Sequence, residues 1–121
     1  MRILIVDDDE HVASGIRMAL TLRGYAAEAC ATAEEALERL RTGPWALVIS
    51  DLRLPGMDGQ HLLRYVGEVQ PAARRILITG FGTPETALWA RQEVDDCLLK
   101  PFTSQSLLQA VQRLLPEAEV E

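Results

Sequence analysis

Short apolar runs alternate with helix-period patterns along the whole chain. The apolar runs predict strands at residues 3–6, 25–30, 46–49, 75–78 and 97–99. The run at 25–30 is alanine-rich and carries Glu28, which favours a place at the edge of a sheet. Five strand–helix alternations are typical of a parallel sheet covered by helices on both faces. The nearly continuous apolar character of the first, third and fourth runs fits strands that are buried on both sides.

Threonines mark where several of the intervening helices begin. Thr32 followed by Glu35 forms a capping-box pattern. Thr83 precedes Pro84, a residue tolerated at the first helical position, and Thr103 precedes the last helical pattern. Residues at helical spacing, together with Cys30, are expected to be buried: Val12, Ile16, Ala19, Leu20, Ala36, Leu37, Leu40, Leu62, Leu63, Val66, Leu107, Leu108, Val111, Leu114 and Leu115.

Polar side chains follow four of the five predicted strands. Residues 7–9 are three consecutive aspartates after the first strand, Asp51 ends the third, Thr79 the fourth, and Lys100 follows the fifth. Crossover connections are right-handed almost without exception, so the strands run parallel and their carboxyl ends meet at one edge. In such sheets the functional site lies outside those ends. We therefore expect these side chains to share one site.

Carboxylates gathered in this way require a positive partner. Two of them about 4 Å apart repel by roughly 1–4 kcal/mol, so a cluster either raises a pKa or binds a cation. An all-oxygen cluster suits Mg²⁺, and the sequence offers no cysteine or histidine partners at zinc spacing.

The same strand ends supply what phosphoryl chemistry needs. Thr79 can donate a hydrogen bond to a phosphoryl oxygen, Lys100 can neutralise another, and Asp51 can act as the nucleophile that forms an acyl phosphate. A single aspartate at a strand end is most often a helix cap, which is the interpretation that applies to Asp9 alone. Four polar strand ends in this order favour phosphoryl transfer.

Composition narrows the class of protein. The chain has 121 residues and a formal net charge of −6, which suits one acidic domain and argues against direct nucleic-acid binding. No apolar run approaches the ~20 residues of a membrane span, and no signal peptide is expected at the start. Two cysteines are too few for a disulfide scaffold, so a cytoplasmic location is expected.

Residues 2–115 resemble the receiver domain of two-component response regulators. The resemblance is carried by four motifs in order: IVDDD at 5–9, SDLRLPGMDG at 50–59, LITG at 77–80 and LKPF at 99–102. It implies a flavodoxin-like, doubly wound α/β fold, a three-layer sandwich with strand order 2-1-3-4-5 and five helices. The receiver domain would span 1–116, with 117–121 as an acidic tail or the start of a linker.

The resemblance also implies a donor and a metal. A sensor histidine kinase or a histidine phosphotransfer protein would pass a phosphoryl group from its phosphohistidine to Asp51. Mg²⁺, with Mn²⁺ as an alternative, would be held by Asp8, by Asp7 through water, by Asp51, and by the backbone carbonyl of Arg53. The domain would catalyse only its own phosphorylation and slow autodephosphorylation, so it would not be an enzyme in the usual sense.

Further roles follow from the same resemblance. Thr79 and Lys100 would hold the phosphoryl oxygens, and the Lys100–Pro101 peptide bond would be cis. Arg53 and Phe81 would tune the lifetime of the acyl phosphate, with Phe81 slowing the attack of water. Movement of Thr79 would repack the face made by the fourth helix, fifth strand and fifth helix for a downstream effector domain or protein. That face is also a candidate for homodimer contacts, through Arg91, Asp95, Asp96 and Arg113.

One position departs from the family pattern. Cys97 stands where the family usually carries Tyr or Phe, three residues before the lysine, and residues 92–96 lack the usual Ala-Gly-Ala. We hypothesise that Trp89 or Phe102 replaces the missing ring. The simpler alternative is a Trp89 that is exposed or half-buried on its helix.

Two other functions remain open from the residues alone. The first is a Mg²⁺-dependent phosphatase of the haloacid dehalogenase type, with residues 7–9 as its Asp-x-Asp; His11 stands where Thr or Val is expected, and no cap domain fits the length. The second is a receiver that is not phosphorylated and serves only as a docking module. The presence of Asp51, Thr79 and Lys100 argues against it, whereas Cys97 argues mildly for it. His11 and His61 are expected to be solvated on helix surfaces.

Overall fold

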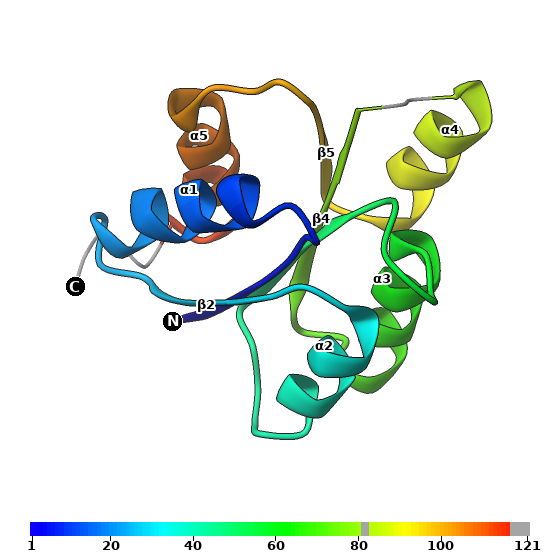
Figure 1. Ribbon diagram of the computed structural model, residues 1–121, viewed down its shortest axis with the longest axis horizontal. Coiled ribbons are helices and arrows are strands. Elements are labelled where there is room, and N and C mark those ends of the chain that lie inside the picture. The colour runs from blue at the N-terminus through cyan, green and yellow to red at the C-terminus, as the bar shows by residue number, and fades with distance from the viewer. Residues whose placement is uncertain (81–82, 117–121) are drawn as a thin grey trace.

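The computed structural model describes residues 1–80 and 83–116, which form a parallel sheet between two layers of helices (Figure 1). The sheet order is β2-β1-β3-β4-β5 and all neighbouring strands are parallel, as predicted, with β2 at an edge. The expected bounds differ from the observed ones by one or two residues, the usual uncertainty at strand ends. The strands are β1 (Arg2–Val6), β2 (Ala26–Cys30), β3 (Leu47–Asp51), β4 (Arg74–Thr79) and β5 (Asp96–Leu99).

Each of the five helices within the described residues begins at a side-chain cap. The N-cap side chains accept hydrogen bonds from backbone N–H groups of the first turn; Thr32 accepts from the N–H of Glu35 at 3.2 Å, as the capping-box pattern predicts. The longest helix has 12 residues, and none within the described part of the chain is long and apolar enough to cross a bilayer. The helices are α1 (Glu10–Thr21), α2 (Ala33–Leu40), α3 (Gly59–Val69), α4 (Pro84–Glu93) and α5 (Ser104–Leu114), capped by Asp9, Thr32, Asp58, Thr83 and Thr103.

Side chains of the central strands alternate between two buried cores. In β1, Ile3 and Ile5 pack with α1 and α5, whereas Leu4 and Val6 pack with α2, α3 and α4. Cys30 is buried in the second core, as expected. Most of the other residues predicted to be buried are buried in the structure. Four of them are only partly buried: Val12, Ala19, Leu37 and Leu108.

Candidate functional site

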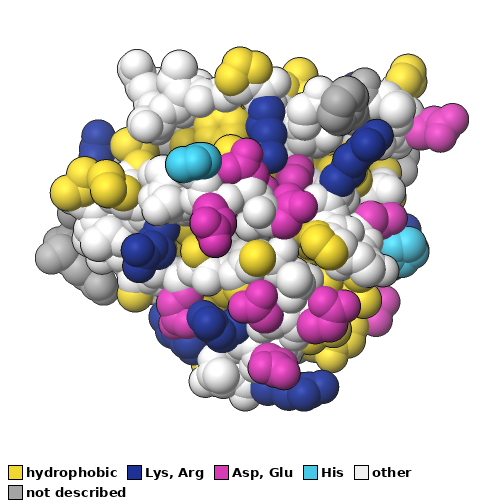
Figure 2. Space-filling model, in the orientation of Figure 1, with side chains coloured by type: hydrophobic (Ala, Val, Ile, Leu, Met, Phe, Trp, Pro, Cys, Tyr) yellow, Lys and Arg dark blue, Asp and Glu magenta, His cyan; other side chains and the backbone are white. Residues whose placement is uncertain are grey.

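The carboxyl ends of four adjacent strands place the predicted site residues at one edge of the sheet. Asp7 follows β1, Asp51 ends β3, Thr79 ends β4 and Lys100 follows β5. Acidic side chains gather near the centre of the face drawn in Figure 2. The topology thus brings residues up to 93 positions apart in sequence (100 − 7) to a single edge.

The side chain of Lys100 bridges two buried carboxylates. Its Nζ lies 3.1 Å from Oδ2 of Asp7 and 3.4 Å from Oδ2 of Asp51. Asp7 is 1 % exposed and Asp51 is 7 % exposed. Burying a charge is costly unless it is paired, and the ammonium group provides that pairing for both carboxylates.

Three carboxylates at the same edge form a hard-oxygen cluster. One carboxylate oxygen from each of Asp7, Asp8 and Asp51 lies within 4.8 Å of the others. Mg²⁺ binds oxygen ligands at about 2.0–2.1 Å, so two ligands on opposite sides of one ion lie about 4 Å apart. The spacing of these oxygens is therefore close to the size that such an ion requires. Asp8 is exposed, which leaves a solvent-facing side for water ligands.

Backbone hydrogen bonds hold the site residues in place. The N–H of Asp9 donates to Oδ1 of Asp7 at 2.9 Å, which fixes the orientation of that carboxylate. The N–H of Lys100 donates to the carbonyl of Thr79 at 2.8 Å, which ties the end of β5 to the end of β4. These hydrogen bonds anchor the site residues to the backbone at the strand ends of the sheet.

Burial and charge together set the protonation of the two central groups. Burial raises the pKa of Asp51 above 3.8, the nearby Asp7 raises it further, and Lys100 and the N–H of Leu52 act in the opposite direction. Burial alone would lower the pKa of Lys100, but its contacts with Asp7 and Asp51 outweigh burial and raise that pKa above 10.5. Lys100 is therefore a cation at neutral pH.

The raised pKa of Asp51 has a consequence for stability. Because the folded state holds the Asp51 proton more tightly than the unfolded chain does, ionisation of this carboxyl destabilises the fold. That penalty is fully present above the raised pKa and absent below 3.8. Asp51→Asn is therefore expected to raise the free energy of unfolding at neutral pH, with Asp7 still paired to Lys100. The gain should shrink as the pH falls toward 3.8.

Urea unfolding without divalent metal, at neutral pH and at low pH, measures this difference. Glu38→Gln is the matched control, because Glu38 is an exposed carboxylate and its removal should have little effect. An Asp51→Asn protein that is less stable than the parent at neutral pH would contradict the expectation.

Three other predicted site residues fall within the described part of the chain: Arg53, Cys97 and Pro101. Arg53 is exposed in the segment after β3, and the Lys100–Pro101 peptide bond is cis. Cys97 is partly buried in β5, where burial, followed by the charge of Asp96, raises the pKa of its thiol. The predicted tuning residue Phe81 lies outside the described residues.

The two aromatic candidates lie on opposite faces of the sheet. Phe102 packs with the core beneath α1 and α5, whereas Trp89 and Cys97 pack against the core beneath α2, α3 and α4. Phe102 is therefore on the wrong face to replace a ring at position 97. Trp89 is partly buried, which agrees with the simpler alternative of a tryptophan that is half-buried on its helix.

Three of the four residues proposed for homodimer contacts have ion-pair partners within the chain: Asp95, Asp96 and Arg113. Nη2 of Arg113 lies 2.8 Å from Oδ2 of Asp96, and Nη1 of Arg74 lies 3.3 Å from Oδ1 of Asp95. Asp95 also accepts a hydrogen bond from the N–H of Arg75 at 2.8 Å. A dimer that used the candidate contacts Asp95, Asp96 and Arg113 would have to share or break these internal pairs.

The two histidines lie at the surface, as expected. His11 is exposed near the start of α1. His61 is exposed on α3, where its Nδ1 lies 3.0 Å from Oδ1 of Asp58. Neither joins the carboxylate cluster at the sheet edge.

Two neighbours of Asp51 were not predicted. The hydroxyl of the buried Ser50 donates to the Asp51 carbonyl at 2.9 Å. Gly59 lies against the same carbonyl, because a Cβ at position 59 would be 2.0 Å from the Asp51 oxygen. The motif at 50–59 contains both residues, but only the folded backbone reveals their roles.

The chain has a doubly wound α/β fold with paired carboxylates and a lysine at its strand ends. Comparisons with known proteins identify the family to which this combination belongs. Residues 3–112 match the response regulator receiver domain. The C4-dicarboxylate transport transcriptional regulatory protein DctD of Rhizobium meliloti is 36 % identical over 112 residues, 92 % of this chain and 24 % of that protein. The chain therefore belongs to the response regulator receiver domain family of two-component systems.

Solved structures agree with this assignment. A CheY-like response regulator receiver domain protein from Methanospirillum hungatei JF-1 has a TM-score of 0.90 at 32 % identity, covering 98 % of this chain and 95 % of that one. A response regulator protein from Burkholderia pseudomallei, with a phosphorylated aspartic acid, calcium ion and citrate, has a TM-score of 0.84 at 30 % identity, covering 98 % and 71 %.

Proposed function

We propose that this receiver domain accepts a phosphoryl group on Asp51 from a phosphohistidine of a sensor kinase or histidine phosphotransfer protein in the cytoplasm. The observation that carries the proposal is the position of the Asp51 carboxylate, 3.4 Å from the Lys100 ammonium and within the cluster formed with Asp7 and Asp8. The phosphorylated aspartic acid of the similar Burkholderia pseudomallei protein supports it.

The transfer is a displacement at phosphorus. A carboxylate oxygen of Asp51 forms a bond to phosphorus while the bond from phosphorus to the donor's imidazole nitrogen breaks, and the nitrogen keeps the bonding electrons. Lys100 lowers the pKa of Asp51, which favours the ionised carboxylate, and it offsets the charge of the transferring oxygens. Thr79, buried at the end of the neighbouring strand, is the proposed hydrogen-bond donor to one phosphoryl oxygen.

The carboxylate cluster is proposed to hold Mg²⁺ or Mn²⁺. Asp7, Asp8 and Asp51 supply hard oxygen ligands, and the backbone carbonyl of Arg53 is a further candidate. When bound, such an ion offsets negative charge on the phosphoryl oxygens. The N–H of Asp9 donates a hydrogen bond to the Asp7 carboxylate and so orients it within this cluster.

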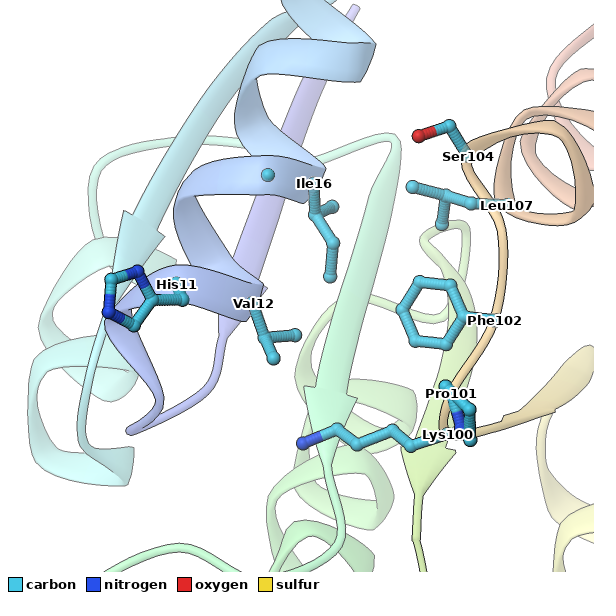
Figure 3. A pocket seen from close by; sticks show the side chains of 9 residues that line it. His11, Val12, Ile16, Lys100, Pro101, Phe102, Ser104 and Leu107 are labelled. Atoms are coloured by element: carbon cyan, nitrogen blue, oxygen red, sulfur yellow. The ribbon is translucent and has the colours of Figure 1, made fainter.

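A hollow beside the site is proposed to receive the protein that carries the phosphohistidine. It measures about 500 Å³ and lies between α1 and the segment that leads from β5 into α5. Val12 and Ile16 face Phe102 across it, while Lys100 reaches past its lower end (Figure 3). Gly15 widens the α1 side, since a Cβ there would meet nothing within 4 Å. An apolar wall beside Lys100 suits a protein donor, because the core of a protein–protein interface is apolar.

Phosphorylation is proposed to act as a switch. A phosphoryl group adds up to about two negative charges at Asp51, and reversing a 1:99 population to 99:1 needs about 5.5 kcal/mol. Charge-assisted hydrogen bonds from Thr79 and Lys100 at roughly 1.5–3 kcal/mol each approach that sum. We propose that the face of α4, β5 and α5 transmits the change. Because the chain spans about a quarter of DctD, a downstream effector domain is part of the proposal, with residues 1–116 as the receiver.

Intact-mass spectrometry after incubation with acetyl phosphate and Mg²⁺ tests the proposal. The parent protein should gain one labile phosphoryl group, and Asp51→Asn should gain none. Asp8→Asn should lose most of the Mg²⁺ dependence while remaining folded, because Asp8 is exposed.

The same assay distinguishes the alternatives. No mass gain in the parent would favour a docking module that is not phosphorylated. Repeated turnover of a phosphate monoester would favour a phosphatase instead.

A further inference from the structure

The buried polar and charged residues gather at adjacent strand ends of the sheet. Among residues 1–80 and 83–116 they are Asp7, Ser50, Asp51 and Thr79, and Ser50 is 0 % exposed. Asp7, Asp51 and Thr79 belong to the proposed phosphorylation site at the ends of β1, β3 and β4. Ser50 is buried directly beside them, and its burial also requires an explanation.

Packing alone does not explain a serine at this position of β3. Its neighbours across the sheet are Val6 in β1 and Leu77 in β4, and both belong to the core beneath α2, α3 and α4. Val48, two residues earlier on the same face, is buried in that core as well. A hydroxyl buried among apolar side chains is costly unless it forms a hydrogen bond. The hydrogen bond that Ser50 forms therefore accounts for its presence.

The hydroxyl of Ser50 holds the peptide unit that joins Asp51 to Leu52. Its Oγ donates to the carbonyl oxygen of Asp51 at 2.9 Å, and Gly59 packs against the same oxygen. At the other end of this peptide unit, the N–H of Leu52 donates to the carbonyl of Ile78 at 2.9 Å. The peptide unit is thus held at both its oxygen and its N–H, which fixes its rotation.

This peptide unit connects the proposed acceptor to the proposed metal-binding segment. Asp51 carries the reacting carboxylate before it, and Arg53, whose backbone carbonyl is a candidate Mg²⁺ ligand, follows it. Because a peptide unit is planar and rigid, its rotation redirects the chain on both sides. A group that fixes this rotation therefore fixes the position of the carboxylate relative to the carbonyl.

We propose that Ser50 is a positioning residue for phosphorylation. Its hydroxyl orients the peptide unit between Asp51 and Leu52, and thereby sets the Asp51 carboxylate and the Arg53 carbonyl for the metal and the phosphoryl group. Ser50 acts through the backbone of its neighbour rather than on the reacting atoms. This inference rests on the proposed function, in which Asp51 is the acceptor.

Ser50→Thr and Ser50→Val form a matched pair that tests the proposal. The two new side chains share a branched shape, and only threonine has a hydroxyl. At saturating Mg²⁺, acetyl phosphate should phosphorylate Ser50→Val about 10-fold more slowly than the parent, less than the roughly 10²-fold that a 1 Å misplacement can cost. Calorimetric titration without a phosphodonor should show Mg²⁺ binding about 10-fold weaker, as when a group that orients a metal ligand is lost. Ser50→Thr should restore both values toward those of the parent.

A purely structural role for Ser50 predicts a different pattern. Urea unfolding of the same proteins would then show altered stability, while the phosphorylation rate and the Mg²⁺ affinity of Ser50→Val stayed at the parent values; that result overturns the inference. Equal losses in Ser50→Thr and Ser50→Val overturn it too, because they would trace the effect to side-chain shape. If the added methyl group prevents folding, Ser50→Ala removes the oxygen alone and should show the losses expected of Ser50→Val. Parent values in Ser50→Ala would overturn the inference.

Calorimetry and mass spectrometry separate this inference from the proposed function. A mass gain in the parent, with equal rates and Mg²⁺ affinities in all variants, overturns the inference and leaves the proposed function standing. No mass gain in the parent overturns the proposed function. The role of Ser50 toward the metal is then decided by calorimetry: weaker Mg²⁺ binding in Ser50→Val than in Ser50→Thr supports it, and equal binding overturns it.

Discussion

Replacement of Lys100 by methionine is expected to slow the phosphorylation of Asp51 by about 10²–10³-fold, the usual effect of losing a group that stabilises developing charge. Lys100 is the single lysine in the sequence, and its Nζ contacts both Asp7 and Asp51. Without it, the pKa of Asp51 should rise further, because Lys100 is the largest of the influences that lower that pKa. Both effects reduce the reactivity of the carboxylate.

The rate of mass gain with acetyl phosphate measures this effect. Lys100→Arg is the matched variant: it keeps the charge but presents a planar fork instead of a compact ammonium, so it should recover part of the rate. A Lys100→Met protein that is phosphorylated at the parent rate would show that the ammonium is not part of the reacting site.

Replacement of Gly59 by alanine is expected to lower the free energy of unfolding by about 1–3 kcal/mol, the cost of overpacking a well-packed site. The new Cβ would lie 2.0 Å from the carbonyl oxygen of Asp51, and that oxygen belongs to the backbone at the end of β3. The clash can be relieved only by moving the strand end or the start of α3. The phosphorylation rate should therefore fall together with stability.

Urea unfolding of Gly59→Ala beside Gly15→Ala gives a matched comparison. Gly15 is exposed within α1, and a Cβ there meets nothing within 4 Å, so alanine should stabilise the helix by about 0.5–1 kcal/mol. Equal effects of the two substitutions would contradict the close packing of Gly59 on the reacting residue.

The strand ends could be predicted because their signal is local. Each apolar run stops at a polar residue, and parallel topology then brings those residues to one edge. This reasoning located Asp7, Asp51, Thr79 and Lys100 together from the sequence, and the structure places them there. The helix starts at Thr32, Thr83 and Thr103 were predictable for the same reason, since a cap acts within one turn.

Contacts between distant segments could not be predicted in this way. The contact of Lys100 with Asp7, rather than with Asp51 alone, depends on how the β5 end leans across the sheet. The packing of Gly59 on the Asp51 carbonyl depends on the path of the loop between β3 and α3. Trp89 and Phe102 were equivalent candidates in sequence, and only the fold shows that they lie on opposite faces.

Chemical trapping of the phosphorylated residue tests the central claim most directly. Borohydride reduces an acyl phosphate to an alcohol, which converts a phosphorylated aspartate to homoserine and releases phosphate. After incubation with acetyl phosphate and Mg²⁺, peptide mass spectrometry should find homoserine at position 51 alone. Homoserine at position 7 or 8, or a phosphoryl group that resists reduction on a serine, threonine or histidine, would contradict the assignment of Asp51 as the acceptor.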